Sequence, residues 1–287
     1  FPFVWGTLAQ QGQVYGNRSF GAKVDTQNKL WFSYPGYNEL LSGSADDTRI
    51  RSNDKLPNPN KTFLEYLNEM PAYRNKVMAF GGWDVFPSII NETRSGIPVN
   101  AGFTPAKGTL LSETEKLLNR LQEEIRGPWE SVRLDPFTHH YALEALRIHK
   151  PSIMYMAYGE TDDWAHDGKY DEYLKSAKQT DAYLKEIWET LQADPHYRNK
   201  TTMLITVDHG RGTTKESWKS HGADVPGAGQ VWLMAIGPDT PALGEIKQEG
   251  QWHSAMLPRT IFQLLGLDYP DAKAAQVLPW VIGEKGN

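Results

Sequence analysis

The sequence contains no cysteine, which excludes disulfides and thiolate chemistry and leaves any bound metal ion to histidine and carboxylate ligands. It lacks a run of about 20 apolar residues, so no membrane span is expected, and no signal peptide is visible. Its net charge of -5 gives no indication of a basic, nucleic-acid-binding surface. Repeats and low-complexity tracts are also absent. The composition, 39% hydrophobic and 23% charged, is that of a globular protein. Any catalytic chemistry must therefore use residues other than cysteine.

Short apolar runs alternate with segments of helical periodicity along the chain. The strand-like runs lie at residues 76–80, 153–158, 202–207 and 231–236. The helical segments lie at residues 37–41, 62–68, 113–126, 137–148, 170–191 and 254–265. This alternation predicts an α/β fold, a three-layer sandwich whose mostly parallel central sheet is covered by helices on both faces. Residues 1–287 are expected to form one domain with long loops at 43–59 and 86–109.

An aspartate and a histidine follow two of the predicted strands. Asp162 and His166 come after the strand at 153–158, and Asp208 and His209 come directly after the strand at 202–207. Ligands gather at the carboxyl ends of strands in open α/β sheets, and carboxylate with imidazole suits zinc, manganese or iron. A single pair is more typical of a surface or a helix cap. Two pairs after two strands predict a metal site.

Ser33 stands just before a proline and a short apolar helix that ends at Gly43. A hydroxyl at a helix N-terminus lies beside free backbone N–H groups and the positive end of the helix dipole, which also suit a phosphate. The residues alone leave two interpretations open. Ser33 is a helix N-cap, or it is a nucleophile that needs a base or a metal to activate it.

The motifs occur in an order that resembles the alkaline phosphatase superfamily. They are Ser-x-Pro followed by Leu-Leu-Ser-Gly, then Asp-x-x-x-His, Asp-His-Gly and Ser-His-Gly-Ala-Asp, spread over about residues 5–267. The nearest likeness is to the nucleotide pyrophosphatase/phosphodiesterase branch. The resemblance implies two divalent metal ions, zinc or else manganese, and hydrolysis of a small-molecule phosphoester through a phosphoserine intermediate. It also implies export to the periplasm or the extracellular space.

Carried over to this sequence, the resemblance assigns Asp162, His166 and His221 to one metal. It assigns Asp208 and His209 to the second metal, with Ser33 as nucleophile and further ligand. His221 is preferred to His253 because the Ser-His-Gly-Ala-Asp run around His221 matches the family motif. His253 is expected to be structural or at the surface. His139 and His140 are expected to be partly exposed and receive no role.

Two departures from the family pattern bear on the prediction. An aspartate that ligates the second metal ends the family's first core strand, and only Asp25 precedes Ser33, in a polar stretch. We therefore expect that strand to have been lost before residue 1. Phosphodiesterase relatives also carry an asparagine where this chain has Gly36. Asn38, or backbone N–H groups at the start of the helix, would then bind the phosphoryl oxygen.

Three other functions compete with a phosphoester hydrolase. A sulfatase motif would require arginine where Tyr37 stands, and sulfatases favour calcium held by carboxylates. A metal-dependent phosphoglycerate mutase would need a large inserted domain after the serine, which residues 43–139 do not obviously provide. A degenerate relative would bind a ligand without turnover. The residues do not indicate the substrate or the oligomeric state.

Overall fold

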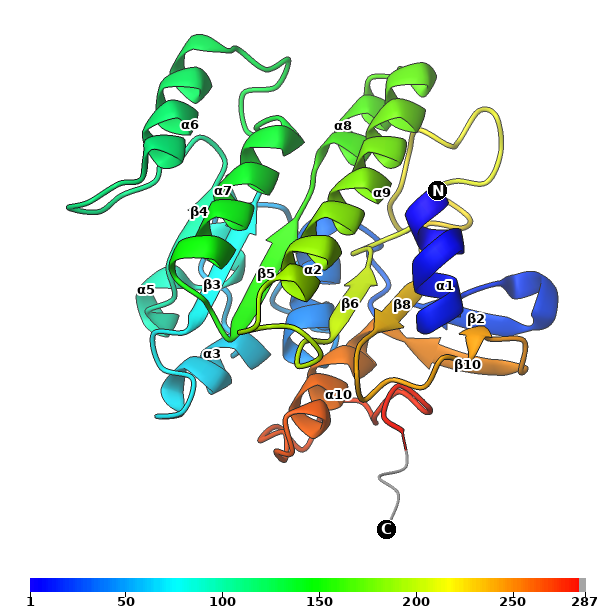
Figure 1. Ribbon diagram of the computed structural model, residues 1–287. Helices are drawn as coiled ribbons and strands as arrows, with labels where there is room; N and C mark the ends of the chain where they lie inside the picture. The colour runs from blue at the N-terminus through cyan, green and yellow to red at the C-terminus, as the bar shows by residue number, and fades with distance from the viewer. Residues whose placement is uncertain (284–287) are drawn as a thin grey trace. The chain divides into compact units, whose positions relative to one another are not determined.

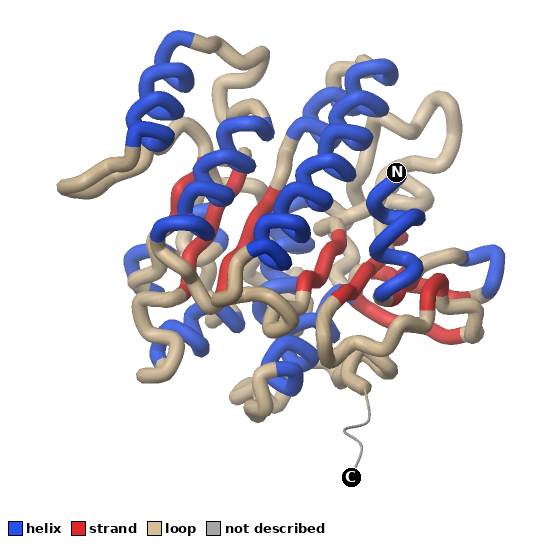
Figure 2. The backbone as a smooth tube through the Cα atoms, viewed as in Figure 1, coloured by secondary structure: helices blue, strands red, loops and turns tan. Residues whose placement is uncertain are grey.

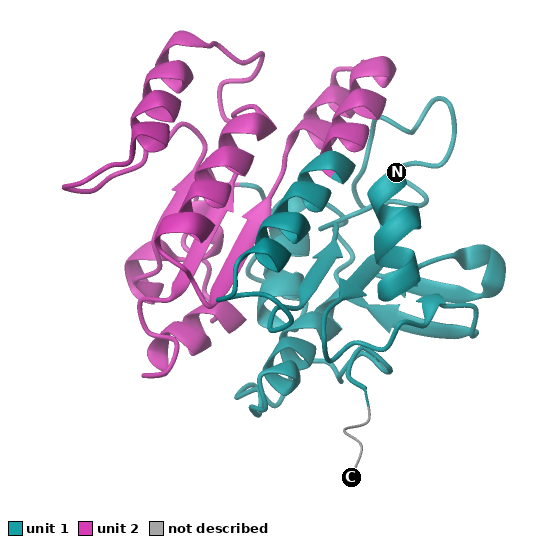
Figure 3. Ribbon diagram, viewed as in Figure 1, with its two compact units in different colours: residues 1–53, 181–287 teal, residues 54–180 magenta. Residues whose placement is uncertain are grey.

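The computed structural model describes residues 1–283, which fold into two compact units. Unit 1 contains residues 1–53 and the described residues from 181 onward, and unit 2 contains residues 54–180 (Figure 3). Each unit builds its own sheets, so each is described separately. The expectation of a single domain over 1–287 stays a prediction.

Unit 2 is organised around a parallel three-stranded sheet in the order β4-β3-β5. The strands are β4 (Val99–Ala101), β3 (Val77–Gly81) and β5 (Ile153–Ala157), and both pairings are parallel. Parallel strands need crossover connections, and helices fill them here. Figure 1 shows α7 (Asp135–Ile148) lying along this sheet. The carboxyl ends of all three strands therefore share one edge.

The two faces of the unit 2 sheet follow the alternation of its side chains. Phe80, with Met78, Met154 and Met156 beside it, joins an apolar cluster with α7 and α6 (Glu113–Glu124). On β5 the alternate residue Tyr155 contacts the ring of Phe86 at 5.8 Å between centroids. Phe86 begins α4 (Phe86–Ile89), which is followed by α5 (Glu92–Ser95), and α3 (Phe63–Glu69) precedes β3. Unit 2 is thus a helix–sheet–helix sandwich.

Unit 1 contains two mixed sheets. The first has the order β6-β8-β1-β9 and comprises β6 (Met203–Thr206), β8 (Leu233–Ile236), β1 (Gln13–Tyr15) and β9 (Gly244–Glu245). The second has the order β10-β2-β7 and comprises β10 (Gly250–His253), β2 (Ala22–Asp25) and β7 (Gln230–Val231). In each sheet one pairing is parallel, β1 with β9 and β10 with β2.

The helices of unit 1 pack on these sheets and on one another. The N-terminal π-helical turn η1 (Val4–Leu8) and α1 (Ala9–Gln11) share a core with β8 and the later part of α9 (Tyr170–Ala193). The helix α2 (Ser33–Ser42) packs against η3 (Ser254–Met256) and α10 (Leu257–Leu264). A short 3-10 turn, η2 (Arg18–Phe20), precedes β2. None of the described helices has the length and apolar character needed to cross a membrane.

The predicted α/β fold is confirmed, and every predicted strand and helix forms within a few residues of its expected bounds. The parallel pairing expected of the sheet is complete in unit 2, whereas the sheets of unit 1 are mixed. The run 231–236 is interrupted at Trp232, because β7 and β8 join different sheets. Long stretches without helix or strand also follow the strands, for example residues 207–229 (Figure 2).

The expectation for Asp25 was wrong in one respect. Asp25 ends β2, in which Ala22 and Val24 are fully buried, so it does follow a buried strand. The strand was missed because it is only four residues long and its other two side chains are polar. Both nitrogens of the Arg18 guanidinium end donate to Asp25 Oδ1 at 3.0 Å, so this carboxylate is already engaged.

Candidate metal centre

Ser33 lies at the start of α2, the helix that the sequence predicted after it. The N-cap is Phe32, whose side chain makes no capping bond, and Ser33 is the first residue of the helix. Ser33 Oγ lies 3.4 Å from His209 Nε2. The N-cap interpretation is therefore wrong, and the hydroxyl faces a predicted metal ligand within unit 1.

His209 follows β6, as predicted, and its ring orientation is fixed by the backbone. His209 Nδ1 lies 2.9 Å from the Gly210 carbonyl oxygen. A carbonyl oxygen can only accept a hydrogen bond, so Nδ1 carries the proton and the lone pair of the neutral ring is on Nε2. The side chain is 4% exposed. Ring orientation by a second hydrogen bond is typical of histidines that ligate metals.

His221 shows the same arrangement in the loop after β6. Its Nδ1 donates to the Trp31 carbonyl oxygen at 3.2 Å, which again leaves Nε2 for a ligand. The rings of His209 and His221 stack, with centroids 3.9 Å apart and an angle of 29° between their planes. Two imidazolium rings would repel each other at this distance. The pair therefore fits neutral histidine ligands.

Asp208 and His209 bring two hydrogen-bond acceptors close together, an arrangement that a nearby cation would stabilise. Asp208 Oδ2 lies 3.4 Å from His209 Nε2, and Nε2 carries no proton in the tautomer that Gly210 selects. A carboxylate oxygen and an imidazole lone pair repel unless a proton or a metal cation lies between them. The donor set of His209, Asp208 and the Ser33 hydroxyl is oxygen and nitrogen only, which suits zinc or manganese. These residues of unit 1 therefore fit a divalent metal.

Two glycines allow the backbone segments of this group to approach closely. A Cβ on Gly36 would lie 2.2 Å from the Asp208 carbonyl oxygen, so α2 can pack against the Asp208 segment only with glycine there. A Cβ on Gly210 would lie 2.1 Å from the Gln230 carbonyl oxygen. The glycine of the Asp-His-Gly motif is thus required by packing.

The structure corrects the expectation that Asn38 binds a phosphoryl oxygen. Asn38 is fully buried, and its amide donates to the Ser44 carbonyl oxygen at 3.2 Å. An asparagine that sequence reasoning missed lies at the helix start instead. Asn53 Oδ1 accepts a hydrogen bond of 3.0 Å from the Tyr34 N–H, next to Ser33. No sequence signal identifies Asn53, because the contact joins positions across a loop.

In unit 2, the predicted ligands Asp162 and His166 lie on α8 (Glu160–His166), directly after β5. Their spacing places them on one face of this helix, and His166 Nε2 lies 3.3 Å from Asp162 Oδ2. Their side chains are 35% and 45% exposed respectively. The structure thus places these two residues side by side on α8.

The start of α8 is held by Asp135, a residue that sequence reasoning gave no role. Asp135 Oδ1 and Oδ2 accept from the N–H groups of Gly159 at 2.7 Å and Glu160 at 3.3 Å, while Glu160 Oε1 accepts from the Asp135 N–H at 2.9 Å. Each side chain therefore caps the other residue's helix. Burial, with the nearby Glu160 charge, raises the pKa of Asp135 from 3.8 to about 8.

The remaining histidines lie outside this group. His253 ends β10, with its Nδ1 bonded to the Asp25 carbonyl oxygen at 3.2 Å, which fits the expected structural role. The expectation that His139 is partly exposed was wrong. His139 is fully buried and its Nδ1 lies 2.9 Å from Tyr158 Oη, whereas the next residue, His140, is exposed. His139 lies on the inner face of α7, and His140 points away from it.

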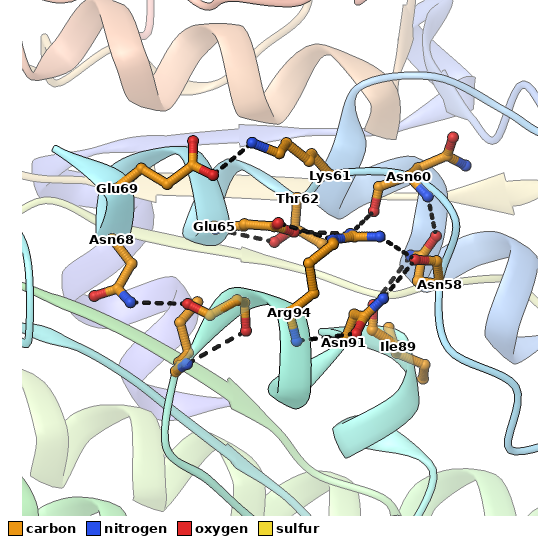
Figure 4. A network of polar contacts seen from close by, with 12 residues as sticks. Asn58, Asn60, Lys61, Thr62, Glu65, Asn68, Glu69, Ile89, Asn91 and Arg94 are labelled. Atoms are coloured by element: carbon orange, nitrogen blue, oxygen red, sulfur yellow. Dashed lines mark hydrogen bonds and ion pairs between the residues drawn. The ribbon is translucent and has the colours of Figure 1, made fainter.

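The end of one predicted long loop, 43–59, is fixed by polar contacts in unit 2. Figure 4 shows Arg94, which donates to both oxygens of the buried Glu65 at 2.8 Å. Arg94 also donates to the carbonyl oxygens of Asn58 and Asn60, each at 2.8 Å. Asn58 in turn donates to the Ile89 carbonyl oxygen at 3.0 Å. The loop around residues 58–60 is therefore tied to α3, α4 and α5.

A family model described as the Metalloenzyme superfamily matches residues 137–228 of this chain. That segment contains five of the six predicted site residues: Asp162, His166, Asp208, His209 and His221. Ser33 lies outside it. The match thus covers the Asp/His motifs of both units.

One curated relative is the 2,3-bisphosphoglycerate-independent phosphoglycerate mutase of Haloarcula marismortui, 27% identical over 135 residues. The match covers 46% of this chain and 24% of the mutase, so the chain spans about a quarter of that relative's length.

Solved structures share the fold at low identity. A putative sulfatase from Bacteroides thetaiotaomicron matches with a TM-score of 0.63 and 14% identity, over 95% of this chain and 67% of its own. The phosphonate monoester hydrolase of Silicibacter pomeroyi matches with a TM-score of 0.59 and 13% identity, over 96% of this chain and 71% of its own. Residues 137–228 are thus similar to the Metalloenzyme superfamily, and the chain shares its fold with these hydrolases over most of its length.

Proposed function

We propose that this protein is a metal-dependent hydrolase of phosphoric esters that uses Ser33 as its nucleophile. The observation that carries the proposal is the geometry at the start of α2. Ser33 Oγ lies 3.4 Å from His209 Nε2, and the contact of Nδ1 with the Gly210 carbonyl oxygen holds the neutral ring in the tautomer with an unprotonated Nε2. A hydroxyl on the first turn of a helix, beside nitrogen and carboxylate ligands, suits attack on a phosphorus atom.

The ligand roles follow the family resemblance. Asp208, His209 and Ser33 would hold one divalent metal, and Asp162, His166 and His221 would hold the other. When bound, two such metal ions supply charge neutralisation for the transferring phosphoryl group and activation of the serine hydroxyl. Zinc is the metal that these ligands favour most, and manganese is the alternative.

The chain's own residues position the reacting groups. Ser33 Oγ would form the new bond to phosphorus while the ester oxygen departs on the opposite side, which leaves a phosphoserine that water then hydrolyses. The Asn53 oxygen accepts from the Tyr34 N–H, so its amide nitrogen remains to donate to a phosphoryl oxygen. Glycine at position 36 keeps the start of α2 against the Asp208 segment.

Two alternatives remain for the same site. Tyr37 stands where a sulfatase motif carries arginine, which disfavours a sulfatase, although solved sulfatases share the fold. The mutase from Haloarcula marismortui favours phosphoryl transfer to a second hydroxyl as the other outcome. The partner is a small-molecule ester in each case. We also propose, from the resemblance alone, that the protein works outside the cytoplasm.

The test compares three nitrophenyl esters: a phosphodiester, a phosphomonoester and a sulfate. Full-length protein is loaded with zinc or manganese and assayed beside Ser33→Ala and the exposed-serine control Ser19→Ala. The proposal predicts release of nitrophenol from a phosphoester by the native protein and by Ser19→Ala. Ser33→Ala is expected to lose at least about 1,000-fold in rate.

The covalent step is tested separately. Acid quenching during turnover, followed by mass spectrometry of peptides, should find a phosphoryl group on Ser33 and on no other serine. Hydrolysis that survives in Ser33→Ala would contradict the nucleophile assignment. Turnover of the sulfate ester alone would replace the proposal by a sulfatase, and absence of turnover with all three esters would leave a binding protein.

A further inference from the structure

A buried carboxylate on α2, Glu39, has no part in the chemistry proposed above. It is fully buried, and Oε1 accepts from the Gln27 N–H at 2.8 Å and the Ser254 hydroxyl at 2.7 Å. Oε2 accepts from the Asn28 N–H and from the Asn28 side-chain amide, each at 2.8 Å. Four neutral donors thus satisfy an acceptor that is costly to bury.

Asn28, which is held by Glu39, in turn fixes the backbone of the segment before Ser33. It is fully buried, and its Oδ1 accepts from the N–H groups of Leu30 at 3.2 Å and Trp31 at 3.0 Å. Trp31 has a φ of +52°, a left-handed conformation that a bulky residue adopts only when its surroundings impose it. Its indole packs on Gly229, where a Cβ would lie 2.6 Å from Nε1.

The carbonyl group of this strained residue, Trp31, contacts the predicted metal ligand His221. The Trp31 carbonyl oxygen accepts from His221 Nδ1 at 3.2 Å, and in the neutral ring this bond selects the tautomer with an unprotonated Nε2. In water the neutral imidazole of a histidine favours the opposite tautomer, with its proton on Nε2, so the protein must supply the preference. The contacts therefore form a continuous series from Glu39 through Asn28 and Trp31 to the His221 ring, entirely inside unit 1.

We propose that Glu39 is a positioning residue for His221. By fixing Asn28, it holds the Trp31 carbonyl in the place that keeps the His221 proton on Nδ1 and Nε2 ready for a ligand. This role deepens the proposed function, on which it rests for its purpose, but the tautomer of His221 is a property of the protein without metal. Hydrogen bonds that orient metal-ligating histidines typically change metal affinity by about 10–100-fold when they are removed.

The first experiment reads the tautomer directly. Long-range proton–nitrogen NMR spectra of the metal-free full-length protein, at about pH 8.5 where imidazole is neutral, are compared for native protein, Glu39→Gln and Asn28→Ala. We expect the native His221 ring to carry its proton on Nδ1 and both variants to move it toward Nε2. His209, whose Nδ1 bonds to its own neighbour Gly210, serves as the internal control.

The second experiment measures zinc affinity by competition with a chelator. Glu39→Gln is expected to raise the Kd at least about 10-fold. Glu65→Gln, which changes an equally buried carboxylate in unit 2, controls for general loss of stability and should leave the Kd within about 2-fold of native.

The two readouts separate the possible failures. A His221 ring that keeps its Nδ1 proton in Glu39→Gln and in Asn28→Ala would overturn the positioning role. A tautomer change without zinc binding by any variant would support the positioning role while contradicting the proposed function. If Glu39→Gln does not fold, Asn28→Ala decides the outcome, because it breaks the same series of contacts while leaving Glu39 three of its donors.

Discussion

The predicted ligands in unit 1 and those in unit 2 are held in different ways. In unit 1, His209 and His221 are fixed ring by ring, each through Nδ1 to a backbone carbonyl oxygen, and the His209 side chain is 4% exposed. In unit 2, Asp162 and His166 bond to each other on a short helix and are 35% and 45% exposed. The first pair is fixed at the side chain, and the second is positioned mainly through its backbone.

This difference predicts which ligands would contribute most to metal affinity. A ligand whose ring orientation and tautomer are already fixed loses little conformational entropy on binding, whereas an exposed side chain loses more. The capping bonds of Asp135 and Glu160 fix the backbone at the start of α8 and do not involve the more exposed Asp162 and His166 side chains. We therefore expect the unit 1 ligands to contribute more affinity per residue.

The largest expected effect comes from removing one predicted histidine ligand from each unit, first His209 and then His166. His209→Ala should lower zinc affinity and kcat/KM by at least about 100-fold, and His166→Ala by about 10-fold, because the rigid ligand contributes more. Chelator competition and steady-state kinetics on the same preparations measure both quantities. Equal losses in the two variants would remove the distinction between the units.

The second prediction concerns the backbone that supports the unit 1 ligands. Gly36→Ala would force a Cβ to within 2.2 Å of the Asp208 carbonyl oxygen, and we expect it to reduce the free energy of unfolding by about 1–3 kcal/mol. The matched control is Gly6→Ala, also in a helical turn, where a Cβ would contact nothing within 4 Å. That change should be neutral or stabilising by up to about 1 kcal/mol. Urea denaturation of both variants makes the comparison.

The third prediction concerns the polar contacts that fix a loop in unit 2. Arg94→Lys removes the bidentate contact to the buried Glu65 and two bonds to loop carbonyl oxygens, and should cost about 1–2 kcal/mol of unfolding free energy. Arg120→Lys affects only an exposed pair with Glu124, 3.9 Å apart, and should change stability by less than about 0.5 kcal/mol. Similar losses from both would show that the Figure 4 contacts do not stabilise the unit.

The smallest effect is expected in the pH dependence of stability. Burial raises the pKa of Asp135 from 3.8 to about 8, so between these values the folded protein keeps a proton that the unfolded chain has released. This contribution is fully present at lower pH and is lost as the pH rises toward 8. Asp135→Asn should flatten that dependence by less than about 1.4 kcal/mol per pH unit. Chemical denaturation from pH 5 to pH 8 measures the slope, and an unchanged slope would contradict the assignment to Asp135.

Sequence patterns predicted the elements well where periodicity was long. The 24-residue helix α9 and the apolar strands β3, β5 and β6 were recognisable because apolar residues repeat or run together over their length. The short strands β1, β2 and β9, of two to four residues, were missed. They hold too few residues to establish a period, and their pairing partners lie far away in the chain.

For the candidate site, the sequence revealed the ligand types but not what holds them. Asp162, His166 and His209 were all predicted from their place after a strand and from the family motifs. The bond that fixes His221 joins positions 190 residues apart, and Trp31 adopts a left-handed conformation that no propensity predicts. The roles of Asn53, Asp135 and Glu39 likewise depend on tertiary contacts, so only the structure identifies them.

The central claim is that these residues form a metal centre, and metal content tests it most directly. Full-length protein would be incubated with zinc, desalted and measured by mass spectrometry beside His209→Ala, Asp162→Ala and Ser33→Ala. The account predicts about two zinc ions per chain in the native protein, fewer in His209→Ala and Asp162→Ala, and near-native content in Ser33→Ala. A native protein that retains no zinc and no manganese would contradict the account.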